Sequence, residues 1–312
     1  MASLRSVFRN TKLRTLDYVL HGQGGMMVPN YRSAAGYGRH VRIDMPSIAT
    51  NGIQTHFEMK GEGAPVVLVS GLGGTGAYWG PQIEALSRQY QVITYDQRGA
   101  GGSDHPDMAY SIEMLADDLE ALISALGVER PALIGHSTGG AIGQILAARG
   151  PDLLRGMVQY ASWSKSDAHF NWVFRLRRAL LANAPIEEYV HGSALFLYPP
   201  EHVQQGGAAL SERLLDSVRT FPDPAIIMRR IDAITAHDAM AVLGRIRIPT
   251  LVICANDDIL TPPYQARILA EAIPGAELQV LPEGGHSLSE TQPEIFNRIV
   301  LDFLASITAT AA

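Results

Sequence analysis

The sequence contains one cysteine, Cys254, and no apolar run close to the ~20 residues that cross a membrane as a helix. A single cysteine excludes a disulfide framework within a monomer and fits a reducing compartment, so we expect a cytoplasmic protein that binds no membrane. Positive charge is also scarce, since 25 Lys and Arg stand against 31 Asp and Glu. Nucleic-acid binding needs a basic surface, and we therefore expect no nucleic acid among the partners.

With 312 residues, 46% of them hydrophobic, the chain is long enough for one large α/β domain or for a core with an inserted subdomain. Residues 1–44 differ from the rest because they carry seven Lys and Arg but only two Asp. This basic arm lacks the continuous apolar core of a secretory signal. It could be an oligomerisation arm, a flexible extension, or the product of a start codon placed before Met45. We favour a non-catalytic arm, through which a homo-oligomer could form.

Short apolar runs alternate with helical patterns along most of the remaining chain. A turn at Asn51-Gly52 predicts a hairpin, and the apolar runs predict strands at 48–51, 53–60, 65–70, 91–95, 132–134, 156–160, 250–254 and 277–281. Helical spacing falls at 81–90, 111–126, 141–148, 263–272 and 293–307. This alternation predicts a mostly parallel central sheet flanked by helices, with an active site beyond the carboxyl ends of the strands.

Residues 162–246 interrupt this alternation. They contain helical stretches at 172–184, 208–220 and 225–236 but no candidate for a central strand. We therefore predict an α/β core built from residues 45–161 and 247–312, with a helical lid, or cap, inserted at 162–246.

The stretch from Ala132 to Ala148 has the pattern of a nucleophile elbow. An apolar strand ends in Gly-His-Ser-Thr-Gly, and a helical pattern follows at once. The turn must hold Ser137 in a strained conformation, which crowds the positions where Gly135 and Gly139 lack a Cβ that would clash. The start of the following helix offers backbone N–H groups to a developing negative charge. A glycine-rich turn with an incidental serine is the alternative interpretation.

A serine hydroxyl needs a base to take its proton, and the base needs a third group to orient it. Loops after the last two predicted strands supply the candidates Asp258, with its neighbour Asp257, and His286. His286 would act as general base and then as general acid. Asp258 would hold the imidazole, with Asp257 as a competitor for that role. His136, beside the serine, is interpreted as structural, and Cys254 as a small buried hydrophobic residue.

Together these motifs resemble those of the α/β-hydrolase-fold serine hydrolases over residues 48–304. Five stretches carry the resemblance, in the order found in that family: 70–74, 96–103, the elbow, 256–262 and 285–286. The acid loop of the family has a proline four residues after the carboxylate, which selects Asp258 rather than Asp257. The resemblance therefore implies an α/β-hydrolase fold with a triad of Ser137, Asp258 and His286.

The resemblance also implies the oxyanion hole. The family's donors correspond to the backbone N–H groups of Leu72 and Thr138. Ser70 stands where many members have histidine, but the donation comes from the backbone, so the hole should be retained. We expect acyl transfer without a cofactor, and His136 and His286 show no spacing typical of metal ligands.

Within this family the chain is most similar to the aminoacrylate or carbamate hydrolases of uracil degradation. The similarity lies at 70–79, 95–101, 195–199, 253–262 and 284–286. It implies cleavage of a small ester, lactone, amide or carbamate through an acyl-enzyme, in the catabolism of a small nitrogenous or aromatic compound. Five aromatic residues are predicted to line the substrate pocket and could serve a larger substrate: Trp79, Trp163, Phe170, Trp172 and Tyr198.

Other functions would use the same residues. Enol-lactonases and carbon–carbon bond hydrolases resemble the chain only somewhat less, and a perhydrolase would use the same triad. A ligand receptor on a hydrolase fold, with slow turnover, is an alternative of another class. Haloalkane dehalogenation is disfavoured, because that reaction needs a carboxylate where this chain has Ser137.

Overall fold

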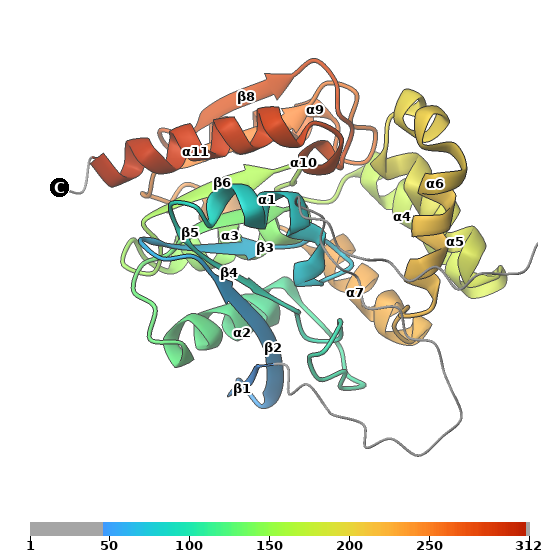
Figure 1. Ribbon diagram of the computed structural model, residues 1–312, viewed down its shortest axis with the longest axis horizontal. Coiled ribbons are helices and arrows are strands. Elements are labelled where there is room, and N and C mark those ends of the chain that lie inside the picture. The colour runs from blue at the N-terminus through green and yellow to red at the C-terminus, as the bar shows by residue number, and fades with distance from the viewer. Residues whose placement is uncertain (1–45, 310–312) are drawn as a thin grey trace, which may run out of the picture. The chain divides into compact units, whose positions relative to one another are not determined.

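The computed structural model describes residues 46–309, and one eight-stranded sheet forms its centre (Figure 1). The strands are β1 Ser47–Thr50, β2 Ile53–Lys60, β3 Pro65–Val69, β4 Gln91–Tyr95, β5 Ala132–His136, β6 Gly156–Tyr160, β7 Thr250–Ala255 and β8 Glu277–Leu281. They lie in the order β1-β2-β4-β3-β5-β6-β7-β8. β2 pairs antiparallel with both β1 and β4, and all other pairs are parallel. The prediction of a mostly parallel α/β sheet is therefore confirmed.

Helices cover both faces of this sheet. One face carries α1 Gly80–Leu86, which follows a 3₁₀ turn at Gly76–Trp79, together with α10 Leu288–Thr291 and α11 Pro293–Ala309; the other carries α2 Ile112–Ala125, α3 Thr138–Arg149 and α9 Pro263–Ala272. Side chains of β3 alternate between the two resulting cores, with Val67 and Val69 beneath α2 and α3 and Val66 and Leu68 beneath α1 and α11. Burial on both faces explains why this strand is a continuous apolar run.

The turn between β1 and β2 is set by Asn51 and Gly52. Both residues have a positive φ, of 42° and 79°. A type I′ turn requires this combination, and Asn-Gly adopts it at low cost. The predicted hairpin is therefore confirmed, with Thr50 opposite Ile53.

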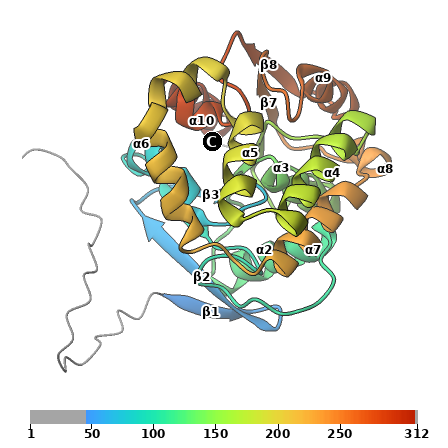
Figure 2. The ribbon, with the colours of Figure 1, turned by 90° about the vertical axis from the view of Figure 1, so that its right-hand side faces the viewer.

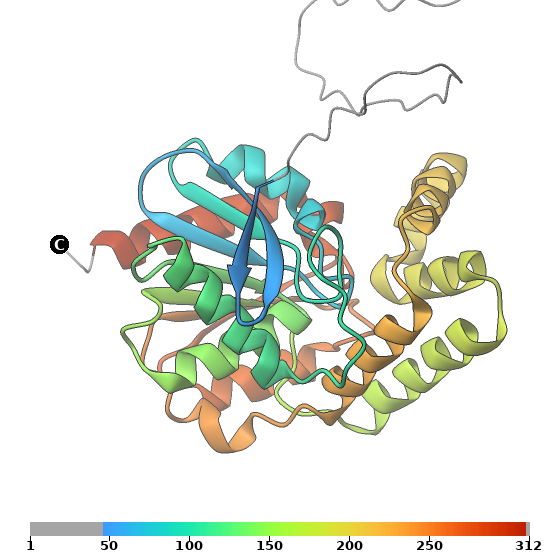
Figure 3. The same cartoon turned by 90° about the horizontal axis from the view of Figure 1, so that it is seen from below.

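Five helices lie between β6 and β7, and we call the segment that contains them the helical insertion. They are α4 Ala168–Asn183, α5 Ile186–Leu197, α6 Pro200–Val218, α7 Pro224–Ala236 and α8 Met240–Leu243. Figures 1 and 2 show α4 to α7 gathered at the end of the sheet toward which the parallel strands point. Figure 3 shows the same group from below, with α7 next to the core and α4 to α6 farther out.

The sequence patterns predict helices at α4, α6 and α7 but miss α5 and the short α8. Gly192 lies in the middle of α5, and glycine weakens a helix by about 1 kcal/mol relative to alanine. Packing overrides this preference here. A Cβ at Gly192 would lie 2.7 Å from Leu180 Cδ1 of α4, so the small residue lets the two helices approach each other.

The basic arm predicted at residues 1–44 lies outside the described residues. The hypothesis of a homo-oligomer through that arm therefore stays a prediction. Among residues 46–309, no helix is both long enough and apolar enough to span a membrane.

A buried ion pair fastens the loop after β4 to α2. Arg98 Nε and Nη2 donate to the two carboxylate oxygens of Asp118 at 2.8 and 2.6 Å. Asn51 Nδ2 donates to the same carboxylate at 2.7 Å. The adjacent residue of α2, Asp117, pairs instead with Arg149, and this second pair is exposed. The two aspartates thus offer a direct comparison of a buried and an exposed ion pair.

We expect Asp118→Ala to lower the free energy of unfolding by about 3–5 kcal/mol, because it leaves the charge of Arg98 buried without its partner. Asp117→Ala should cost less than about 1 kcal/mol, since exposed ion pairs contribute little. Urea denaturation of the parent and both variants measures the difference. Equal losses of stability in the two variants would contradict the importance assigned to the buried pair.

Candidate active site

Ser137 occupies the sharp turn between β5 and α3, with φ 51° and ψ −112°. This conformation is unfavourable for a residue with a Cβ, so the surrounding structure must hold it. The neighbouring glycines permit it. A Cβ at Gly135 would lie 2.5 Å from the carbonyl carbon of Gly139, and a Cβ at Gly139 would overlap the carbonyl oxygen of Val69 in β3. The predicted crowding around the serine is therefore confirmed.

His286 and Asp258 come together from the loops that follow β8 and β7. His286 Nδ1 lies 2.9 Å from Asp258 Oδ2, and both side chains are buried. Asp258 is itself held in place, because its Oδ1 accepts from the backbone N–H groups of Leu260 and Thr261 at 2.8 and 2.9 Å. A carboxylate fixed in this way can orient an imidazole and stabilise its protonated form.

Asp257 has a different set of contacts. Its two carboxylate oxygens accept from the backbone N–H groups of Gly284 at 3.2 Å and Gly285 at 2.8 Å. Asp257 therefore fixes the backbone of the loop that carries His286. The structure brings Asp258, rather than this competitor, to the imidazole.

The position of His286 is also fixed through its backbone. Its carbonyl oxygen accepts from Tyr160 Oη at 2.8 Å and lies 3.2 Å from His136 Nε2. His136 is stacked between Tyr78 and Tyr160, with ring centroids 4.6 and 4.7 Å apart. Burial lowers the pKa of His136 well below its usual value of 6.5, so this ring stays neutral beside His286. These contacts support the structural role expected for His136.

A cavity of about 210 Å³ opens between the carboxyl ends of the strands and the helical insertion. Ser137 and His286 line it, as does Leu72 from the loop after β3. A Cβ at Gly71 would lie 3.3 Å from Ser137 Cβ, so this loop reaches the serine. Thr138 directly follows the serine and is the first residue of α3. Both candidate oxyanion donors therefore belong to segments that adjoin Ser137.

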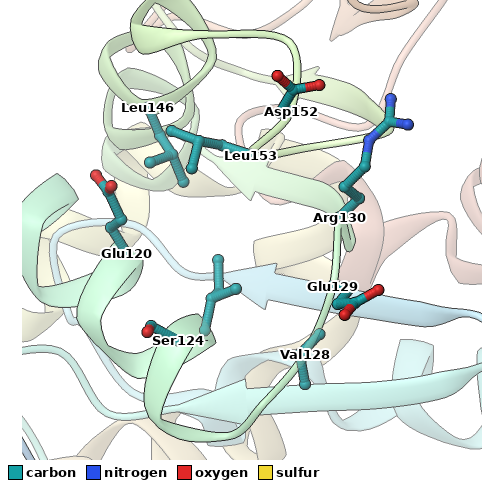
Figure 4. A pocket seen from close by; sticks show the side chains of 9 residues that line it. Glu120, Ser124, Val128, Glu129, Arg130, Leu146, Asp152 and Leu153 are labelled. Atoms are coloured by element: carbon teal, nitrogen blue, oxygen red, sulfur yellow. The ribbon is translucent and has the colours of Figure 1, made fainter.

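A larger cavity, of about 420 Å³, lies elsewhere in the molecule. Figure 4 shows Glu120 and Ser124 of α2 on one side of it and Arg130 and Asp152 on the other. Arg130 precedes β5 and Asp152 precedes β6, whereas Ser137 follows β5. This cavity therefore opens at the amino-terminal edge of the parallel strands, opposite the edge where active sites of such sheets lie.

Of the five aromatic residues predicted to line the substrate pocket, the structure places Tyr198 in the cavity wall. Trp79, Trp163 and Phe170 are buried in the core instead, where the last two stack with ring centroids 4.6 Å apart. Trp172 is 74% exposed. The prediction is wrong for these four, because the place of a side chain in the packed structure, rather than its size, decides whether it reaches the cavity.

The insertion contributes to the cavity through one face of α4 and through the end of α5. Phe174 and Arg177 line the cavity. They follow Phe170 by four and seven residues, which places all three on the same side of a helix. Trp172 lies off that face. Counting the helical period onward from Phe170 would identify both residues, whereas Glu290 reaches the cavity from α10 without any sequence signal.

Arg177 brings a positive charge to the cavity. Its Nε donates to Ser193 Oγ at 3.2 Å and its Nη2 to Tyr189 Oη at 3.1 Å. The guanidinium also lies over the rings of Phe174 and Tyr189. All of these partners are neutral, so they hold the group in place without neutralising its charge. The cavity thus offers a fixed cation to an anionic substrate group.

The acidic group on the cavity wall is already paired. Glu290 Oε2 accepts from Tyr198 Oη at 2.8 Å, and Oε1 forms an ion pair with Arg213. The charge of Glu290 is therefore balanced locally, while that of Arg177 faces neutral partners. In the part of the chain that the structure describes, no group of three or more His, Cys, Asp or Glu side chains is arranged to hold a metal ion.

Comparison with known proteins agrees with this geometry. The alpha/beta hydrolase fold family matches residues 64–293. A protein of Azorhizobium caulinodans named as a carbamate hydrolase, RutD, is 37% identical over 264 residues, which cover 84% of this chain and 99% of that protein. A protein of the same name from Pseudomonas savastanoi is 40% identical over 244 residues, with 78% and 94% covered. Among solved structures, the enol-lactonase from Burkholderia xenovorans LB400 is 29% identical, with a TM-score of 0.77 over 83% of this chain and 100% of that one.

We expect Asp258→Ala to lower kcat for ester hydrolysis by about 10⁴-fold, because the imidazole loses the carboxylate that orients it. Asp257→Ala should lower kcat by no more than about 10-fold, since it removes two hydrogen bonds to the loop backbone and leaves the imidazole contact intact. Steady-state kinetics with 4-nitrophenyl acetate compares the two variants. A larger loss for Asp257→Ala than for Asp258→Ala would reverse the assignment.

Proposed function

Since the chain belongs to the alpha/beta hydrolase fold family, we propose that it is a serine hydrolase in which Ser137 is the nucleophile. The observation that carries this proposal is the strained turn at Ser137, which adjoins the same cavity as His286, whose imidazole is held by Asp258. The proposed substrate is a small carbamate or a related amide, ester or lactone.

In the proposed reaction, Ser137 Oγ attacks the substrate carbonyl while His286 takes the serine proton. Nδ1 of that ring faces Asp258, which leaves Nε2 for the serine. The backbone N–H groups of Leu72 and Thr138 stabilise the charge on the carbonyl oxygen, and each such donor is worth about 3 kcal/mol. His286 then protonates the leaving group. Water releases the acyl group by the same steps, and no cofactor takes part.

The size and charge of the cavity support a small and polar substrate. Its volume of about 210 Å³ is below the ~300–1,000 Å³ of pockets for drug-sized ligands. The fixed charge of Arg177 suits a substrate whose acyl part carries a negative charge. The relatives named carbamate hydrolase support a carbamate, and the enol-lactonase neighbour makes a lactone the second candidate.

The helical insertion is proposed to act as the lid of this site. Phe174 and Arg177 of α4 line the cavity, and so do Leu197 and Tyr198 at the end of α5. Ser137 and His286 come from the core, so substrate would be enclosed between the two parts. The insertion would then select the substrate, while the core performs the chemistry.

The first test is hydrolysis of a series of 4-nitrophenyl acyl esters by the parent and by Ser137→Ala. We expect the variant to lose about 10⁴-fold or more in kcat, because the nucleophile is absent. Short acyl chains should be preferred, since the cavity is small. Equal hydrolysis by parent and variant would contradict the nucleophile assignment, and a single burst without turnover in the parent would favour a ligand receptor.

A second test concerns the charge of Arg177. We expect Arg177→Met to lower kcat/KM for the 4-nitrophenyl monoester of succinate by about 10- to 100-fold, because a charge-assisted hydrogen bond is worth ~1.5–3 kcal/mol. For the neutral 4-nitrophenyl valerate, an ester of similar length, kcat/KM of Arg177→Met should differ from that of the parent by less than about 3-fold. Arg178→Met serves as the control, since Arg178 pairs with Asp232 at the surface. Equal losses for the two esters would show that Arg177 does not recognise charge.

A further inference from the structure

Arg230, on α7 of the helical insertion, is buried against the loop that carries Leu72. The residue is 1% exposed. Its Nε donates to Leu72 O at 2.9 Å, its Nη1 to Arg98 O at 2.7 Å and its Nη2 to Gln97 Oε1 at 2.6 Å. One planar guanidinium therefore holds the loop after β3 and the loop after β4 in a fixed relation.

Gln97 extends this connection to both ends of the first loop. Its Nε2 donates to Ser70 O at 2.7 Å, and its backbone N–H donates to Gly74 O at 2.8 Å. Gly74 N–H in turn donates to Gly71 O at 3.0 Å. The segment 70–74 is thus held at its ends by Gln97 and in its middle, at Leu72, by Arg230.

Gly74 lets the guanidinium come this close. Its φ is +74°, and a Cβ there would lie 2.9 Å from Arg230 Nη2 and 2.7 Å from Ala100 Cβ. Any side chain at this position would therefore push the arginine or the loop out of place. Gly74 and Arg230 are therefore matched in size, although they lie far apart in the chain.

Burying this cation is costly. Burial lowers the pKa of Arg230 to about 10, so the group still carries its charge at neutral pH. Its three acceptors are neutral, and the nearby carboxylate of Asp118 is paired with Arg98. An apolar side chain could fill the same space without the cost of desolvation. What only the arginine supplies is the set of three hydrogen bonds to the two loops.

We propose that Arg230 is a positioning residue for the oxyanion site, so that the helical insertion supplies part of the catalytic geometry as well as part of the cavity wall. The hydrogen bond to Leu72 O fixes the residue whose N–H is the proposed donor. A displacement of about 1 Å at such a group can cost 10²-fold in rate. This inference rests on the proposed serine-hydrolase function.

The test compares Arg230→Ala with Arg229→Ala, since Arg229 is the adjacent residue of α7 and pairs with Asp107 instead of the loop. With 4-nitrophenyl acetate, we expect kcat of Arg230→Ala to fall about 10²-fold and KM to change by less than about 3-fold, because the donor acts on the transition state. Arg229→Ala should keep the parental kcat. A kcat for Arg230→Ala equal to that of Arg229→Ala would overturn the proposal.

Rescue of kcat by added guanidinium distinguishes a positioning role of Arg230 from a purely structural one. At millimolar concentration, far below the molar range that unfolds proteins, it should restore part of kcat in Arg230→Ala and leave Arg229→Ala unchanged. A loss of kcat that guanidinium does not relieve would overturn the positioning role. If Arg230→Ala does not fold, Arg230→Lys replaces it: lysine keeps the charge but lacks the planar fork, so kcat should fall about 10-fold, and a parental kcat would overturn the proposal.

Hydrogen exchange of the segment 70–76 separates this inference from the proposed function. Faster exchange in Arg230→Ala than in Arg229→Ala supports the positioning role independently of the reaction catalysed. Unchanged exchange would overturn it. The serine-hydrolase proposal would be contradicted by a different result, namely ester hydrolysis that Ser137→Ala retains.

Discussion

The close approach of β3, β5 and α3 around Ser137 is the constraint on which the site depends. Gly139 lies so near the end of β3 that any Cβ there would overlap the carbonyl oxygen of Val69. β3 and β5 are also neighbours in the sheet, so the loop that follows β3 comes directly beside the serine. The two candidate oxyanion donors, Leu72 and Thr138, therefore lie in the segments that follow two adjacent strands. The packing of these strands and of α3 holds Ser137 in its strained conformation.

His286 is held at the same edge of the sheet through a chain of contacts. β7 and β8 carry Asp258 and His286 in their following loops, and β6 lies between them and β5. Tyr160, the last residue of β6, bridges the gap by donating to the carbonyl of His286. Asp257 anchors the backbone of that loop. The imidazole is thus oriented by its ring partner and by its own backbone, which is how a rigid scaffold holds a loop residue in a reactive geometry.

Two arginines of the helical insertion contact the site in different ways. Arg177 lines the cavity and donates to the hydroxyl groups of Ser193 and Tyr189. Arg230 instead donates to the loop that carries Leu72. The first faces the proposed substrate and the second faces the protein. The insertion is therefore joined to the core through the machinery of the site as well as by apolar packing. Any movement of α7 would displace Leu72, because the guanidinium of Arg230 donates to the carbonyl oxygen of Leu72.

The sequence by itself determined the features that depend on neighbouring residues. The alternation of apolar runs defined the parallel sheet, Asn51-Gly52 defined the hairpin, and the glycines around Ser137 defined the strained turn, because each reflects a local backbone preference. The hydrogen bonds of Asp257 to the loop of His286, the presence of α5 and the burial of Trp163 and Phe170 in the core were decided by the tertiary structure alone. Arg230 shows the reason most clearly, since 158 residues separate it from Leu72. Contacts over such distances depend on how layers and loops pack, and no local pattern records them.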